Sequence, residues 1–154
     1  MQDKLKKLKE KIDFKWRVQS YSKNVPKAQC VAYIDARDVM NKLDDVLGSE
    51  SWQDDYKLID GKLLAGIGVY CDGQWVWKWD TGVESNMEAE KGQMSDAFKR
   101  AGVKWGVGRF LYDLDIVFVD TNEKLDKVKN NYPYVVDSQG KKVWDITKHI
   151  KSSK

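Results

Sequence analysis

The stretch WQDDYKLIDGKLLAGIGVYCDGQWVWKW, residues 52–79, decides the fold because it holds three strand-like runs separated by two Asp-Gly pairs. The runs cover residues 52–59, 62–71 and 74–79. Asp-Gly between alternating runs is typical of a two-residue hairpin, since a type I′ turn needs positive φ at both central positions. The sequence therefore predicts a three-stranded antiparallel meander.

The third run of the meander places three tryptophans on one face. Side chains alternate along a strand, so Trp75, Trp77 and Trp79 point to the same side. Such a face is commonly buried against a helix or another subunit, and the alternative is that the rings stack on nucleic-acid bases. Burial in the core, an interface and base stacking all stay open at this point.

A long helix is predicted after the meander, over residues 87–105. Its apolar residues recur with a helical period and fall within one sector. These residues are Met87, Met94, Ala97, Phe98, Ala101 and Trp105. Lys91, Lys99 and Arg100 fall outside the sector, and Lys104 lies at its edge. Gly106 is expected to end the helix.

Shorter elements are expected around this core. In chain order they are a basic helix at 2–12, a strand at 14–19, a helix at 36–47 capped by Asp35 and ended by Gly48, an apolar run at 116–119, a short helix at 123–130 and an edge strand at 143–146. The order predicts an α+β fold, in which a three-stranded antiparallel meander packs on a long helix, a β-β-β-α core with flanking short helices and strands.

The length of 154 residues suits a single domain. Within it, residues 1–30 form a basic helix and strand, residues 31–120 the core, and residues 121–154 an accessory segment. No apolar run reaches the ~20 residues of a membrane helix, and no signal peptide is visible. These features and the sparse cysteines, Cys30 and Cys71, favour a cytoplasmic location.

The composition also argues against several kinds of cofactor site. His149 is the single histidine and the two cysteines form no CxxC motif, so a zinc site would lack ligands. No GxxxxGK[ST] motif for a nucleotide is present. We expect no cofactor.

The net charge of +3 conceals an uneven distribution. The net charge is +6 for residues 1–30, −8 for 31–90, +4 for 91–112, −3 for 113–140 and +4 for 141–154. A polyanion can therefore meet basic patches on a protein that is nearly neutral overall. For the two termini, the alternative to polyanion binding is that the lysines form solvated faces that keep the protein soluble.

The long predicted helix carries its basic and hydroxyl side chains in two ridges. One ridge consists of Lys91, Ser95 and Lys99, and the other of Arg100 and Lys104. Residues four apart lie along one side of a helix, so each ridge spaces its groups for successive phosphates. The alternative is ordinary surface charge, with an ion pair between Asp96 and Arg100.

A weaker pattern indicates metal-dependent nuclease chemistry. Asp55 and Asp60 each precede a lysine by two residues, and Asp44 and Asp45 lie upstream. Nucleases of this kind hold Mg²⁺ on carboxylates beside a lysine. A hairpin turn already explains Asp60 by geometry, so this interpretation ranks below nucleic-acid binding.

Several segments together resemble one known family. They are YIDARDVMNKLDDVLGSESW at 33–52, WDTGVES at 79–85, EKGQMSDAFKRA at 90–101 and WGVGRFLY at 105–112. The motif Ser-Asp-x-x-Lys-Arg-Ala followed by an aromatic residue and glycine is the most specific part. Residues 30–115 thus resemble the Rad52-like (Rad52/Rad22) single-strand annealing family, of the phage Sak and DdrA type.

The resemblance implies a non-enzymatic, ATP-independent protein that coats single-stranded DNA and anneals complementary strands in recombination and repair. It implies a homo-oligomer, ring or helical filament, with DNA in a positively charged outer groove, and a host or phage single-stranded DNA-binding protein as a further partner. A bacterial or phage-infected cell is the expected setting. A protein that coats DNA without annealing it is the nearest alternative.

The family motifs carry over to particular residues of this chain. The predicted DNA-binding residues are Lys99, Arg100, Lys91, Ser95, Arg37, Lys104 and Arg109. The chain departs from the eukaryotic pattern at Asp38, at Ser49 and at Val103, where that pattern has arginine, an aromatic residue and arginine, respectively.

Overall fold

The computed structural model describes residues 1–83 and 89–153, with only the backbone at residues 89–91. The chain forms two compact units. Unit 1 comprises Met1–Ile12 and Ile34–Tyr112, and unit 2 comprises Asp13–Tyr33 and Asp113–Lys154. Within the described residues, no helix combines the length and the apolar character needed to cross a membrane.

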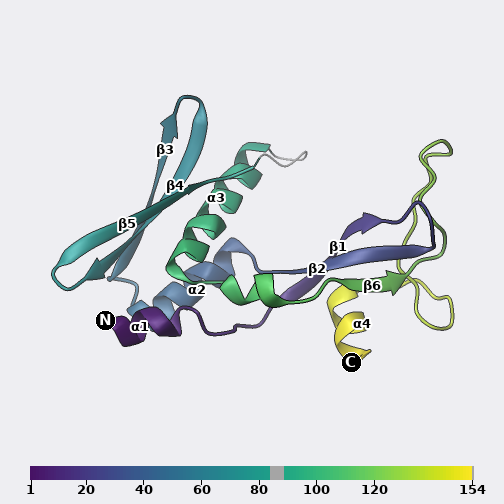
Figure 1. Ribbon diagram of the computed structural model, residues 1–154, viewed down its shortest axis with the longest axis horizontal. Helices are drawn as coiled ribbons and strands as arrows, with labels where there is room; N and C mark the ends of the chain where they lie inside the picture. The colour runs from purple at the N-terminus through teal and green to yellow at the C-terminus, as the bar shows by residue number, and fades with distance from the viewer. Residues whose placement is uncertain (84–88, 154) are drawn as a thin grey trace. The chain divides into compact units, whose positions relative to one another are not determined.

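Unit 1 contains the predicted meander and long helix (Figure 1). Its elements are α1 (Gln2–Lys7), α2 (Ala36–Leu47), β3 (Trp52–Ile59), β4 (Lys62–Cys71), β5 (Gln74–Thr81), α3 (Ala89–Trp105) and the 3-10 helix η1 (Arg109–Asp113). The three strands pair antiparallel in the order β3-β4-β5. The α+β fold class is confirmed, and so is a meander packed on a long helix.

Both hairpins of the meander turn at the expected Asp-Gly pairs. The φ angles are 51° at Asp60 and 76° at Gly61, and 48° at Asp72 and 88° at Gly73. Positive φ at both positions is the type I′ geometry, whose twist matches that of the flanking strands. The turns thus fix the register in which Trp52 pairs with Val69 and Tyr70 with Trp75.

The core of unit 1 lies between β4 and α3. Ala65, Ile67 and Val69 alternate along one face of β4 and are all fully buried. They meet the buried face of α3, which consists of Ala97, Phe98, Ala101 and Trp105. The indole Nε1 of Trp105 donates a 2.8 Å hydrogen bond to the Ile67 carbonyl, which joins helix to sheet. Met94 belongs to the predicted apolar sector but is exposed, and Met87 lies outside the described residues.

The tryptophans of β5 lie on the face of the meander opposite α3, which excludes burial against the long helix among the alternatives left open by the sequence. Lys78 contacts Trp105 of α3 across the inner face, and the neighbouring residues therefore point outward. The rings of Trp77 and Trp79 stack at 5.6 Å and 22° and cover Gly68 and Gly66 of β4. A Cβ at either glycine would lie 2.6 Å from a ring atom, so only glycine allows the rings to lie flat.

Local capping and a close helix crossing position α2 in unit 1. Asp35 and Asp38 exchange side-chain-to-backbone hydrogen bonds of 2.9 Å, a capping box that satisfies two amides of the first turn. Gly48, with φ 88°, ends the helix as predicted. Val39 lies so close to Gly102 of α3 that a Cβ there would approach Val39 Cγ1 to 2.8 Å.

Unit 2 consists of a second sheet and a helix. Its elements are β1 (Lys15–Tyr21), β2 (Lys27–Tyr33), β6 (Val117–Asp120) and α4 (Ile146–Ser152). The sheet is antiparallel in the order β1-β2-β6. Trp16, Val119 and Ile150 belong to its buried core, and the Trp16 amide donates a 2.9 Å hydrogen bond to the Thr147 hydroxyl of α4.

Three of the predicted flanking elements need correction. Residues 123–130 form turns and not a helix, because the Asp126 carboxylate accepts hydrogen bonds from the amides of Val128 and Lys129. Residues 143–146 form no edge strand, since Asp145 caps α4 instead. The N-terminal helix ends at Lys7 and does not reach residue 12. Strand β2 was not predicted at all.

Candidate nucleic-acid interface

The Lys-Arg motif lies on α3 at the boundary between its buried and exposed sides. Ala97, Phe98 and Ala101 are buried, Lys99 is half-buried and Arg100 is exposed. The helical period therefore directs the two cations away from the core, as the sequence indicates. Their role in binding DNA stays a prediction.

Arg100 is partly neutralised within unit 1. Its Nε lies 3.5 Å from the Asp80 carboxylate of β5, and the two side chains are 49% and 21% exposed. The partner considered from the sequence, Asp96, instead accepts a 2.9 Å hydrogen bond from the Val83 amide. A half-exposed pair of this kind contributes little to stability, and the charge of Arg100 is shared with a carboxylate.

Lys91, Ser95 and Arg37 are also predicted to bind DNA. Lys91 lies in α3, but its side chain is outside the described residues, so its ridge with Ser95 and Lys99 stays a prediction. Ser95 is half-buried. Arg37 is exposed in the first turn of α2, two residues before the point where Val39 meets α3. Among the described residues, no hydrogen bond or ion pair joins Arg37 to α3.

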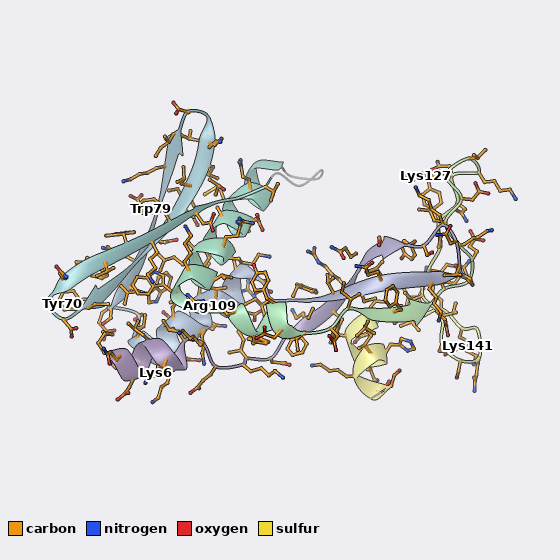
Figure 2. The ribbon with its side chains drawn as sticks, viewed as in Figure 1. Lys6, Tyr70, Trp79, Arg109, Lys127 and Lys141 are labelled. Atoms are coloured by element: carbon orange, nitrogen blue, oxygen red, sulfur yellow. The ribbon has the colours of Figure 1, made fainter. Side chains whose placement is uncertain are left out.

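A cluster of five cations surrounds the C-terminal end of α3. A pocket of about 380 Å³ is lined by Gln2, Leu5, Lys6, Lys9, Lys78, Lys104, Trp105 and Arg109. We call this site the basic pocket. Its lining includes five positive charges and no carboxylate. In Figure 2, Lys6 on α1 and Arg109 beyond α3 mark the two sides of this region.

Three of the five cations of the basic pocket are held by neutral groups. Arg109 donates hydrogen bonds of 2.8 Å and 2.7 Å to the carbonyls of Val103 and Lys104. The Lys104 ammonium donates to the Trp79 carbonyl. The Lys78 ammonium lies 4.4 Å from the centre of the Trp105 ring. Carbonyls and rings fix the position of a charge without cancelling it, so the pocket keeps its positive potential.

The end of α3 explains part of this cluster but not all of it. The unpaired carbonyls at a helix C-terminus carry about half a negative charge, which attracts cations. Five positive charges exceed that amount. Gly106 has φ 111° and allows the residues just after α1 to approach so closely that a Cβ would lie 2.7 Å from Lys9 Cγ. The excess charge suits a ligand with several phosphates.

The sequence predicted Lys104 and Arg109 for the interface but missed Lys6, Lys9 and Lys78. The net charge of +6 over residues 1–30 was a signal for the first two. Alternation placed Lys78 on the face opposite the tryptophans but did not show that the helix covers this face. The tertiary contact between α1 and the end of α3 was needed to bring these residues together.

The carboxylates of the nuclease hypothesis have other structural uses. Asp55 accepts a hydrogen bond from the Tyr56 amide, and Asp60 occupies a hairpin turn. The ammonium of Lys57 lies 4.4 Å from the centre of the Trp79 ring. Across residues 1–83 and 89–153, no group of three or more His, Cys, Asp or Glu side chains is placed to hold a metal ion.

An α+β unit that presents anchored cations at one end of a helix has the features of a polyanion-binding protein. Residues 1–67 and 58–130 match the model of the Rad52/22 family of double-strand break repair proteins. These matches extend over most of the sequence. The chain therefore belongs to the Rad52/22 family.

Two curated relatives show similarity over 110 residues, which is 70% of this chain. The single-stranded DNA-binding protein DdrA of Deinococcus radiodurans is 30% identical, and 52% of its length is covered. The protein of the same name from Deinococcus deserti is 32% identical, with 54% covered. The chain thus spans about half the length of the curated relatives it matches.

Proposed function

We propose that this protein binds single-stranded DNA and anneals complementary strands during recombination and DNA repair. The basic pocket is the observation that carries the proposal, because five cations line it and no carboxylate does. Family membership and the names of the two DdrA relatives support DNA as the polyanion. We assign the activity to the predicted core, residues 31–120, together with Lys6 and Lys9.

The mechanism is physical and not covalent. Lysine and arginine side chains neutralise phosphates and release their counterions, which favours binding most at low salt. The backbone is held while the base edges remain accessible to a second strand. We propose that neither ATP nor a metal cofactor takes part.

Annealing of long strands calls for several subunits, and we propose a homo-oligomer, a ring or a helical filament. Many weak contacts along one strand combine into tight coating. The outward-facing rings of Trp77 and Trp79 are half-buried in this chain, and Trp75 is 39% exposed. We propose that this tryptophan face contacts the neighbouring subunit, with base stacking as the alternative. We also propose that the protein acts in the cytoplasm. We propose a single-stranded DNA-binding protein as its partner.

A strand-mixing assay tests the function. Mixing of complementary strands, one labelled with a donor and one with an acceptor dye, should show faster pairing with the protein than without it. The acceleration should persist with EDTA and without ATP. Binding of single strands without acceleration of pairing would favour the coating alternative, and a requirement for magnesium with strand cleavage would revive the nuclease.

Light scattering at micromolar protein concentration tests the assembly. We expect particles of several subunits, larger in the presence of single-stranded DNA. A uniform monomer that still anneals long strands would contradict the oligomeric model.

A further inference from the structure

Unit 2 contains a broad groove that the proposed function does not use. The groove measures about 1440 Å³ and is lined by β1, residues 132–135, residues 142–145 and α4. We call it the aromatic groove and define it by Arg17, Tyr33, Tyr132, Tyr134, Lys142 and Trp144. Four of these six side chains are aromatic and the other two are cationic.

Two of the aromatic side chains are largely open to solvent. Trp144 is 83% exposed and Tyr132 is 82% exposed. Rings of this size usually bury most of their surface, because hydration of apolar area is unfavourable. Both residues line the same groove, which makes a ligand with flat apolar faces the natural occupant.

The cations of the groove are positioned by rings. The Lys142 ammonium lies 4.1 Å from the centre of the Trp144 ring and 5.0 Å from that of Tyr134. The Arg17 guanidinium lies 5.4 Å from the centre of the Tyr33 ring. A ring face attracts a cation but leaves its charge available to an anion. Each cation is therefore adjacent to an aromatic surface.

A tight turn at residues 137–141 holds Lys142 in place. The Asp137 carboxylate accepts hydrogen bonds from the amides of Lys141 and Gln139, at 3.0 Å and 2.9 Å. The bond from the Lys141 amide lowers the pKa of Asp137. Lys142 then pairs with Val136 in an isolated β-bridge. Figure 2 labels Lys141 in this turn, next to the groove residue Lys142.

The acidic residues that line the groove, Asp13 and Asp145, have partners other than Arg17 and Lys142. Asp13 forms a 3.1 Å ion pair with Lys151, and that hydrogen bond lowers the pKa of Asp13. Asp145 caps α4 by accepting from the Lys148 amide. Unit 2 as a whole carries 12 basic and 8 acidic side chains. The charge surplus favours an anionic ligand.

We propose that the aromatic groove is a second contact surface for single-stranded DNA. The inference rests on the proposed function and assigns a site to the other unit. Bases stack on the open rings of Trp144 and Tyr132, while Lys142 and Arg17 face the phosphates. A duplex keeps its bases stacked inside, so a surface of this kind prefers single strands.

The variant Trp144→Ala in the full chain tests the stacking. Affinity for a fluorescein-labelled thymidine 30-mer, measured by anisotropy, should fall about 5- to 100-fold. Much of the loss should persist at high salt, because stacking is screened less than charge attraction. Trp144→Phe should retain most of the affinity. Phe118→Ala is the matched control, since it removes another exposed ring of unit 2 outside the groove and should change nothing.

The results of these experiments distinguish a failure of the groove proposal from a failure of the proposed function. Lys142→Gln should make the slope of log affinity against log salt shallower by about 0.7. If Trp144→Ala binds like the parent protein while variants of the basic pocket bind poorly, the proposed function stands and the groove proposal is overturned. Binding of an acidic peptide to the groove would not rescue the groove proposal in that case. If the parent protein does not bind the 30-mer at all, both proposals fail.

Discussion

The basic pocket of unit 1 and the aromatic groove of unit 2 place their cations in different surroundings. In the pocket, Lys104 donates to the Trp79 carbonyl of β5, Arg109 donates to carbonyls at the end of α3, and no carboxylate is present. In the groove, Lys142 lies against the exposed ring of Trp144. The pocket is suited to phosphates alone, and the groove is suited to phosphates and bases together.

Because the cations of the two surfaces have different surroundings, the salt dependence of binding can distinguish the surfaces. Binding through charge alone weakens steeply as salt rises, with a slope of about −0.7 per phosphate for single strands. Binding through stacking is less sensitive to salt and depends on the bases. A loss of affinity that disappears at high salt therefore indicates phosphate contacts, which both surfaces offer, and a loss that remains at high salt indicates the stacking surface of unit 2.

The largest effect on affinity is expected from Lys99→Ala combined with Arg100→Ala. Each lost charge-assisted contact should weaken binding by roughly 1–3 kcal/mol, as measured by anisotropy on a single-stranded oligonucleotide. The fold should be retained, because the buried face of α3 is unchanged. A melting temperature near that of the parent protein is the control, and unchanged affinity would remove the Lys-Arg motif from the interface.

The next largest effect concerns the tryptophan face of unit 1. Gly68→Ala places a Cβ 2.6 Å from the Trp77 ring, so the ring must shift and the free energy of unfolding should fall by about 1–3 kcal/mol. Denaturant unfolding measures the change.

A double variant tests whether the loss of stability in Gly68→Ala comes from contact with the Trp77 ring. In the background of Trp77→Ala, the additional Gly68→Ala substitution should cost little, because no ring remains to collide with the Cβ. An equal cost in both backgrounds would show that the ring does not lie flat on Gly68.

A smaller effect is expected from Asp80→Asn. This change removes the carboxylate beside Arg100 and preserves an oxygen that accepts from the Thr81 amide. Arg100 is then free to contact phosphate, so affinity for single-stranded DNA should rise by about two- to fivefold at low salt. A decrease would mean that Asp80 is needed to orient Arg100.

The local features of unit 1 could be predicted from the sequence. Asp60-Gly61 and Asp72-Gly73 determine their turns by backbone conformation alone, and the capping role of Asp35 depends on residues within one turn. These features need no knowledge of distant contacts. The same holds for the buried sector of Phe98 and Ala101, since its period is local.

The missed features depend on contacts between distant segments. Strand β2 is the central strand of its sheet and pairs with β1 and also with β6, about 90 residues away, as in the pair Ala28 and Val119. The direction of the β5 tryptophans followed from alternation, but which face the helix covers did not. Lys6 and Lys9 enter the basic pocket only because α1 packs at the end of α3.

The most direct test of the account compares two double variants of the N-terminal segment. Lys6 in α1 and Lys9 just after it line the basic pocket, whereas Lys4 and Lys7 lie in α1 and do not line it. Both double variants, each pair changed to glutamine, remove the same net charge. Anisotropy on a labelled thymidine 30-mer should show at least tenfold weaker binding and a salt slope shallower by about 1.4 for Lys6→Gln with Lys9→Gln. Lys4→Gln with Lys7→Gln should bind nearly as the parent protein does, and equal losses in both variants would contradict a role for the pocket.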